Sequence, residues 1–287
     1  MSNISLTASM RSNLLSLQNT QSLMDTTQER LSTGKKVNSA IDNPSSYYTA
    51  QSLNNRASDL SSLLDSMGQA IQTIKAADEG IEAITTFAQQ AKAVAQSALD
   101  SSSSTDRADY MKQFNDILTQ IDGVAKDSGY KGVNLLNGGS LSVKFNEDGT
   151  SKLDIAGVKA FSGDDGDLGL AAGEDWGKVA NADTGATTEE TKAQNTAINA
   201  SIKAVDDAIS KLRSMASEFG NNYSIVQSRE DFTENLINVL TEGADKLTLA
   251  DMNEESANML ALQTRQQLAI NSLSLASQAA QSVLKLF

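Results

Sequence analysis

The fold is decided by residues 53–95, which read LNNRASDLSSLLDSMGQAIQTIKAADEGIEAITTFAQQAKAVA. One track of apolar residues returns there every seven positions: Leu53, Leu60, Met67, Ile74, Ile81, Ala88 and Ala95. A repeat of seven that lasts this long is typical of a helix that packs along partner helices. Asn43 suits the N-cap of this helix, and Pro44 suits its first position, because the missing N–H of proline would be unpaired there anyway.

The length of this helix predicts an elongated molecule. As one helix, residues 45–99 would extend about 80 Å at ~1.5 Å per residue. A compact globule of this chain length would be only about 50 Å across. We therefore expect a mainly α fold, an elongated antiparallel helical rod with terminal coiled-coil helices.

Related spacings predict four further helical regions. A capping-box pattern at Ser103 and Asp106 predicts a helix that ends near 127–129, and a second one at Thr187 and Glu190 predicts another. We expect the helical rod to be packed by Leu60, Met67, Ile74, Ile81, Ile202, Val205, Ile209 and Leu212. The two ends carry a self-assembly seam of Leu17, Met24, Leu31, Met252, Met259, Leu262, Leu273, Val283 and Phe287, with Gln266 as its polar exception.

Between the helical regions, the pattern changes from a helical period to a period of two. Leu141, Val143 and Phe145 alternate, an Asp148-Gly149 turn follows, and Ile155 lies on the returning strand, which predicts a β-hairpin. Residues 156–186 show no clear period and are expected to form loops and short pieces. Ten of the 18 glycines lie between 138 and 185, which marks this stretch as an insert.

Composition excludes several classes of function. The chain has no His and no Cys, which excludes Ser-His-Asp and Cys-His catalysis and ordinary zinc sites. A net charge of −13 argues against broad nucleic-acid binding. Residues 137–190 alone carry 11 acidic and four basic residues. The acidic run at 164–167 lacks the trailing Glu of a calcium loop and is interpreted as a solvated loop, so no cofactor, metal or catalytic group is expected.

The two ends look incomplete on their own. Their seams are rich in Ala, Ser and Gln, so one such helix buries too little apolar area to offset the entropy cost of ordering it. Each end therefore needs the other end or another copy of the chain. A monomeric bundle with folded-back arms is the plainer alternative. A membrane-surface helix at the C-terminus is disfavoured because its polar face holds Ser and Gln rather than Lys and Arg.

Several stretches at both ends resemble bacterial flagellin, the filament subunit of the flagellum. The first set covers 14–18, 28–40, 42–44, 53–56, 78–80 and 129–136, and the second covers 250–257, 262–268, 274–276 and 281–287. The resemblance covers roughly 1–137 and 190–287, with both ends in the correct order. It implies a structural, non-enzymatic subunit of a helical polymer used for motility.

The resemblance also implies a division into five segments. These are an N-terminal filament-core helix (1–44), the N-terminal half of the rod (45–137), a hairpin and variable surface insert (138–187), the C-terminal half of the rod (188–245) and a C-terminal filament-core helix (246–287). The terminal helices of the family pair as a coiled coil. The family further implies type III export to the extracellular filament without a cleavable signal peptide. Its members also have an export chaperone, a filament cap protein and hook–filament junction proteins as partners.

One departure from the family pattern concerns an innate immune receptor that recognises many flagellins. The positions that carry its arginine, leucine and glutamate contacts hold Gln89, Ala93 and Gln113 here. Glutamine cannot make a charged bidentate contact, so we expect a weak ligand for that receptor. Two other functions stay open at this stage: a junction protein of the same family, and a hydrolase within the insert, which the short length of the insert and the missing His disfavour.

Overall fold

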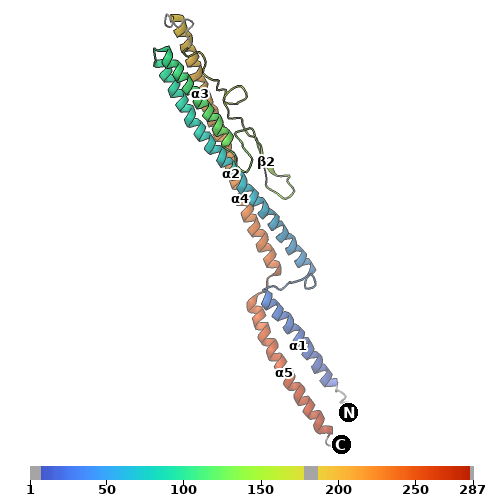
Figure 1. The fold of residues 1–287 in the computed structure, drawn as a ribbon. Coiled ribbons are helices and arrows are strands. Elements are labelled where there is room, and N and C mark those ends of the chain that lie inside the picture. The colour runs from blue at the N-terminus through green and yellow to red at the C-terminus, as the bar shows by residue number, and fades with distance from the viewer. Residues whose placement is uncertain (1–7, 178–186, 285–287) are drawn as a thin grey trace. The chain divides into compact units, whose positions relative to one another are not determined.

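The computed structural model describes residues 8–177 and 187–284 (Figure 1). Within these residues the chain forms five helices and one two-stranded sheet. The elements are α1 (Ala8–Thr33), α2 (Pro44–Asp100), α3 (Ser104–Asp127), β1 (Leu141–Lys144), β2 (Lys152–Ile155), α4 (Thr188–Thr248) and α5 (Met252–Leu284). The predicted mainly α fold with a small β-hairpin is confirmed.

Polar side chains begin the helices where the sequence predicts. The Oδ1 atom of Asn43 accepts from the backbone N–H of Ser46 at 3.1 Å, so Pro44 is the first residue of α2. Thr187 and Glu190 form a complete capping box, with reciprocal bonds of 3.3 and 2.7 Å. At α3 only half of the box forms: the Ser103 hydroxyl accepts from the N–H of Asp106 at 3.3 Å.

The predicted β-hairpin forms within residues 141–155. β1 and β2 are antiparallel, with Leu141 opposite Ile155 and Lys144 opposite Lys152. Gly149 donates to the carbonyl of Asn146 at 3.1 Å and has a φ of +66°, which glycine adopts without strain. The prediction of a hairpin is confirmed, and Asp148-Gly149 ends a four-residue turn, 146–149, inside the loop between the strands.

The chain divides into two compact units. The terminal unit comprises residues 1–58 and 237–287, and the central unit comprises residues 59–236. Residues 45–58 of α2 and 237–245 of α4 belong to the terminal unit. Among the residues described, no helix is apolar over a length that could span a membrane.

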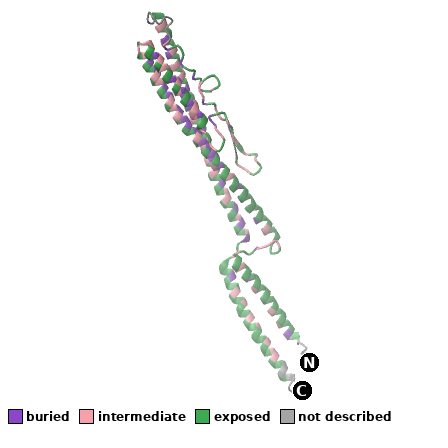
Figure 2. Cartoon of the chain, in the orientation of Figure 1, coloured by how far each residue is buried: buried purple, intermediate pink, exposed green. Residues whose placement is uncertain are grey.

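The central unit holds the hydrophobic core, where buried side chains gather (Figure 2). α2 and α4 run antiparallel there, as the Lys92–Asp206 ion pair of 2.6 Å and the stacking of Lys75 on Tyr223 show. The insert adds Trp176, which is fully buried and lies 4.9 Å from Phe114 between ring centroids. The core therefore joins three helices and the insert, which the helical period alone did not predict.

Candidate self-assembly surface

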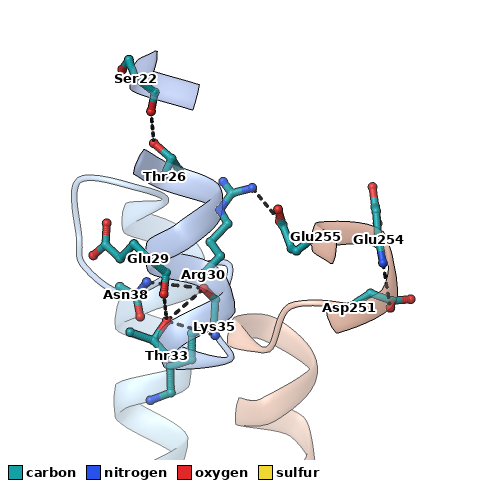
Figure 3. A network of polar contacts seen from close by, with 10 residues as sticks. All are labelled: Ser22, Thr26, Glu29, Arg30, Thr33, Lys35, Asn38, Asp251, Glu254 and Glu255. Atoms are coloured by element: carbon teal, nitrogen blue, oxygen red, sulfur yellow. Dashed lines mark hydrogen bonds and ion pairs between the residues drawn. The ribbon is translucent and has the colours of Figure 1, made fainter. Parts of the chain in front are cut away.

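The terminal unit is built around an antiparallel pair of helices, α1 and α5 (Figure 1). Arg30 near the end of α1 donates from Nη1 to Oε1 of Glu255 near the start of α5, at 3.0 Å (Figure 3). Farther along the pair, Nε2 of Gln266 donates to Oε1 of Gln21 at 2.8 Å. From the first contact to the second, the residue number falls from 30 to 21 on α1 and rises from 255 to 266 on α5. The two helices therefore run in opposite directions.

Backbone hydrogen bonds fix the end of the pair where α1 stops and α5 begins. The N–H of Lys36 donates to the carbonyl of Thr248 at 2.8 Å, and the N–H of Ala250 donates to the carbonyl of Gly34 at 2.9 Å. Gly34 ends α1 with a φ of +71°, the left-handed conformation that allows the chain to leave the helix. Asp251 then caps α5, since its Oδ1 accepts from the N–H of Asn253 at 2.9 Å.

The structure places most of the predicted seam inside this pair. The half-buried members are Leu17, Met24, Leu31, Met259, Leu262 and Leu273. Met252 differs from them because 45% of it is exposed. The side chain of Val283 and all of Phe287 lie outside the described residues. Whether the seam also contacts other copies of the chain stays a prediction.

A second apolar stripe, which the sequence analysis missed, lies on α5. Leu260, Leu268 and Leu275 are 66, 64 and 67% exposed, and we call them the outer stripe. Each leucine lies two positions from an inward residue: Leu262, Gln266 or Leu273. Two positions correspond to about 200° around a helix, so the outer stripe faces away from α1. The spacing of eight and seven residues could have revealed it, but only after the inward face had been assigned.

The helix pair has almost no core of its own. Met10 is the one apolar side chain less than a tenth exposed on the described parts of α1 and α5. Figure 2 shows the same contrast, since these helices are mostly exposed or intermediate along their length. Three leucines of this exposure on one face are unusual for a helix that stays in water. The pair therefore offers apolar surface that the chain does not cover within this unit.

The two units also differ in net charge. The terminal unit carries eight basic and eight acidic residues, and the central unit carries the other 15 basic and 28 acidic residues. The whole net charge of −13 therefore lies on residues 59–236. A neutral surface can approach a copy of itself without like-charge repulsion, whereas an acidic one repels its copies.

The loop between α1 and α2 is organised by one carboxylate. The backbone N–H groups of Ser39 and Asn38 donate to Oδ2 of Asp42, at 2.9 and 3.0 Å, and these bonds hold the pKa of Asp42 below its usual range. Ile41 beside it is 93% exposed. In α4, the Lys246 ammonium at 2.7 Å likewise lowers the pKa of Glu242.

Most of the predicted rod-packing residues lie together in the core of the central unit. Met67, Ile74, Ile81, Val205, Ile209 and Leu212 are buried in it, and Ile202 is half-buried against it. Leu60 is buried too, but outside this core. The receptor-pattern positions Gln89, Ala93 and Gln113 are all exposed.

The acidic loop of the insert has a structural use in the fold. Oδ2 of Asp167 accepts from the backbone N–H of Lys159 at 2.7 Å, and the Asp167 carbonyl accepts from the Lys211 ammonium at 2.7 Å. Over 8–177 and 187–284, no three acidic groups are arranged to hold a metal ion.

A mainly helical chain with a neutral terminal unit, a helix pair that has almost no core and an exposed leucine stripe is typical of a subunit that is completed by its neighbours. Comparisons with known proteins agree with this class. Residues 4–141 match the bacterial flagellin N-terminal helical region, and residues 202–287 match the bacterial flagellin C-terminal helical region. The chain belongs to the bacterial flagellin family.

Individual relatives span nearly the whole chain. Flagellin FljM of Caulobacter vibrioides is 30% identical over 280 residues, covering 96% of this chain and 95% of the relative. A flagellin of Brucella melitensis is 28% identical over 279 residues, with the same two coverages. The crystal structure of Bacillus cereus flagellin is 15% identical, with a TM-score of 0.43, over 58% of this chain and 88% of that one. Nothing in these comparisons favours the junction-protein alternative.

Proposed function

We infer that this chain is a structural subunit that polymerises into the bacterial flagellar filament, and that the outer stripe of α5 contacts other copies. The family supplies the filament role. The observation that carries the contact is the exposure of Leu260, Leu268 and Leu275 on a helix pair with almost no core, in a unit without net charge. Covering these leucines removes apolar surface from water, which stabilises the polymer. Head-to-tail contacts that do not close on themselves extend into helical filaments.

The contact is tested by the double variant Leu260→Gln/Leu268→Gln. We expect the critical concentration for polymerisation to rise at least tenfold, because two exposed leucines lose about 1 kcal/mol or more each of apolar burial. The matched control, Ser272→Gln, places the same amide on the same helix and removes no leucine. Sedimentation and electron microscopy of filaments measure both. Equal critical concentrations for the double variant and the control would exclude the outer stripe from the contact.

We further propose that the chain reaches the outside without cleavage of a signal peptide. Membership of the flagellin family supports this proposal, since residues 4–141 match its N-terminal helical region. Mass spectrometry of native filaments should then find the N-terminal residues 1–11 intact, apart from the initiator Met. An N-terminus that begins after residue 15 would contradict this.

The family also suggests partners and a non-enzymatic role. We propose that an export chaperone, a filament cap protein and hook–filament junction proteins bind this chain. Uncovered apolar surface on α5 supports the chaperone, because such a helix needs a cover before assembly. A purified peptide of residues 246–287 should bind a flagellar export chaperone, and a Leu260→Gln/Leu268→Gln peptide should bind it less tightly. The absence of His and Cys supports a subunit without catalysis.

We propose that the innate receptor responds weakly to this chain. Gln89, Ala93 and Gln113 are exposed, so they are available to a receptor but present neither a cation nor an anion. A receptor-reporter assay should give little activation by the purified wild-type chain, and the triple variant Gln89→Arg/Ala93→Leu/Gln113→Glu should activate more strongly. Strong activation by the wild type would refute this proposal.

A further inference from the structure

The hydrophobic pattern of α5 does not explain which face turns toward α1. The inward face holds Met259, Leu262 and Leu273 beside Gln266, Ala269 and Ala276, and the outer stripe holds three leucines. Each face carries three large apolar side chains, so in an isolated pair of helices burying either face would remove a similar apolar area from water. An interaction other than apolar burial is therefore needed to select the face that lies against α1.

The backbone hydrogen bonds just before α5 fix its position along α1. They leave its rotation about its own axis to side-chain contacts. Those bonds join Lys36 to Thr248 and Ala250 to Gly34, and both precede the first residue of α5. Beyond them, side chains of the two helices meet in the ion pair of Arg30 and Glu255. Glu255 lies on the inward face, one heptad before Leu262.

The Arg30–Glu255 pair is costly to break and well placed to form. The Glu255 side chain is only 9% exposed, and its Oε2 atom is buried without a hydrogen-bond partner among the described residues. Removing Arg30 would leave this carboxylate buried and unpaired. Arg30 lies in the last turn of α1 and Glu255 in the first turn of α5, so both helix dipoles favour these charges.

We propose that Arg30 and Glu255 are positioning residues for assembly: their ion pair fixes the rotation of α5 against α1 and so keeps the outer stripe available to other copies. The pair contributes specificity rather than apolar burial, a use known for polar pairs in helix interfaces. This inference rests on the proposed contact between copies through the outer stripe.

The test uses the natural absence of cysteine. One reporter carries Gln21→Cys and Gln266→Cys, whose native side chains are hydrogen-bonded, and forms a disulfide when α5 has the observed rotation. The other carries Gln21→Cys and Leu268→Cys and forms a disulfide when the outer stripe has turned inward. Each reporter is copolymerised as a minor component in excess wild-type chain, so that crosslinks within one subunit are measured in filaments.

We expect the 21–266 crosslink to dominate in the otherwise wild-type chain. In Arg30→Gln and in Glu255→Gln, the ratio of the 21–266 to the 21–268 crosslink should fall roughly tenfold. This loss lies between the loss expected on breaking an exposed ion pair and the loss expected on breaking a buried one. The exchange Arg30→Glu/Glu255→Arg should restore most of the ratio, though less than fully because both helix dipoles then oppose the charges. The control Lys246→Gln removes the exposed ion pair to Glu242 in the same unit and should leave the ratio unchanged.

Each outcome bears on the proposal. An unchanged ratio in both single variants, or an exchange variant no better than the singles, overturns it. Failure of a single variant to enter filaments supports it if the exchange variant enters, and overturns it if the exchange variant also stays out. If the wild-type chain itself forms no filaments in electron microscopy, the proposed function fails instead.

Discussion

The terminal unit and the central unit are both built from helices with a seven-residue apolar repeat, but the repeat is buried to different extents in the two units. In the central unit, the heptad positions of α2 and α4 are buried in one core. In the terminal unit, the heptad positions of α1 and α5 are only half-buried, and three leucines of α5 point outward. The central unit is also acidic, whereas the terminal unit is neutral. An apolar repeat thus indicates that the helix packs against a partner. The burial of the repeat and the net charge of the unit indicate whether that partner lies in the same chain or in another copy.

The largest expected effect tests whether the two units depend on each other. Deletion of residues 261–287 removes most of α5 but none of the central core. The shortened chain should stay folded and monomeric and form no filaments, because it has lost two of the three outer-stripe leucines and the partner of α1. Circular dichroism, thermal unfolding and electron microscopy measure these properties. Unfolding of the whole shortened chain would show that the central unit is not stable alone.

A pair of leucine truncations compares the two units directly. Leu212 is fully buried in the central core, and Leu262 is half-buried between α1 and α5. Leu212→Ala should lower the free energy of unfolding by about 2–5 kcal/mol, whereas Leu262→Ala should lower it by about 1 kcal/mol or less in the monomer. Urea denaturation of the unpolymerised chain gives both values. Equal losses would mean that the terminal pair is already a complete core without neighbours.

Two helical glycines sharpen the account of the central unit. A Cβ at Gly80 would meet the Ser128 hydroxyl at 2.2 Å and the Leu136 side chain at 2.6 Å, whereas a Cβ at Gly123 would meet nothing within 4 Å. Gly80→Ala should therefore destabilise the protein by about 1–3 kcal/mol through overpacking. Gly123→Ala, the matched control, should stabilise it by up to about 1 kcal/mol through helix propensity. Thermal unfolding that changes in the same direction in both variants would contradict the close approach at Gly80.

The smallest effect concerns the Asp42 loop and pH. The pKa of Asp42 is lowered in the folded state, so the stabilisation by its ionised carboxylate is complete above about pH 5 and is lost as pH falls through the lowered folded pKa, below about 4. Amide hydrogen exchange at Asn38 and Ser39, corrected for intrinsic rates, should accelerate across that range. In Asp42→Ala the two amides should exchange fast throughout, without the pH step. A step that persists in this variant would assign it to another group.

Part of the fold was predictable because local patterns set it. Asn43, Thr187 and Ser103 mark helix starts through bonds to nearby backbone, so short sequence motifs are enough. The buried face of α2 was also predictable, since a repeat of seven defines one side of a helix. Trp176 was not assigned to the core, because it lies in a stretch without a period and reaches Phe114 only in the folded chain.

The candidate self-assembly surface was also predictable only in part. The sequence by itself determined that both ends are amphipathic helices with too little apolar area to stand alone, because composition and period depend on each residue separately. Only the tertiary structure decided which face of α5 lies against α1, and hence that Leu260, Leu268 and Leu275 are left uncovered. The reason is that two faces of this helix have similar apolar content, so the choice depends on the contact between Arg30 and Glu255, which are 225 positions apart in the chain.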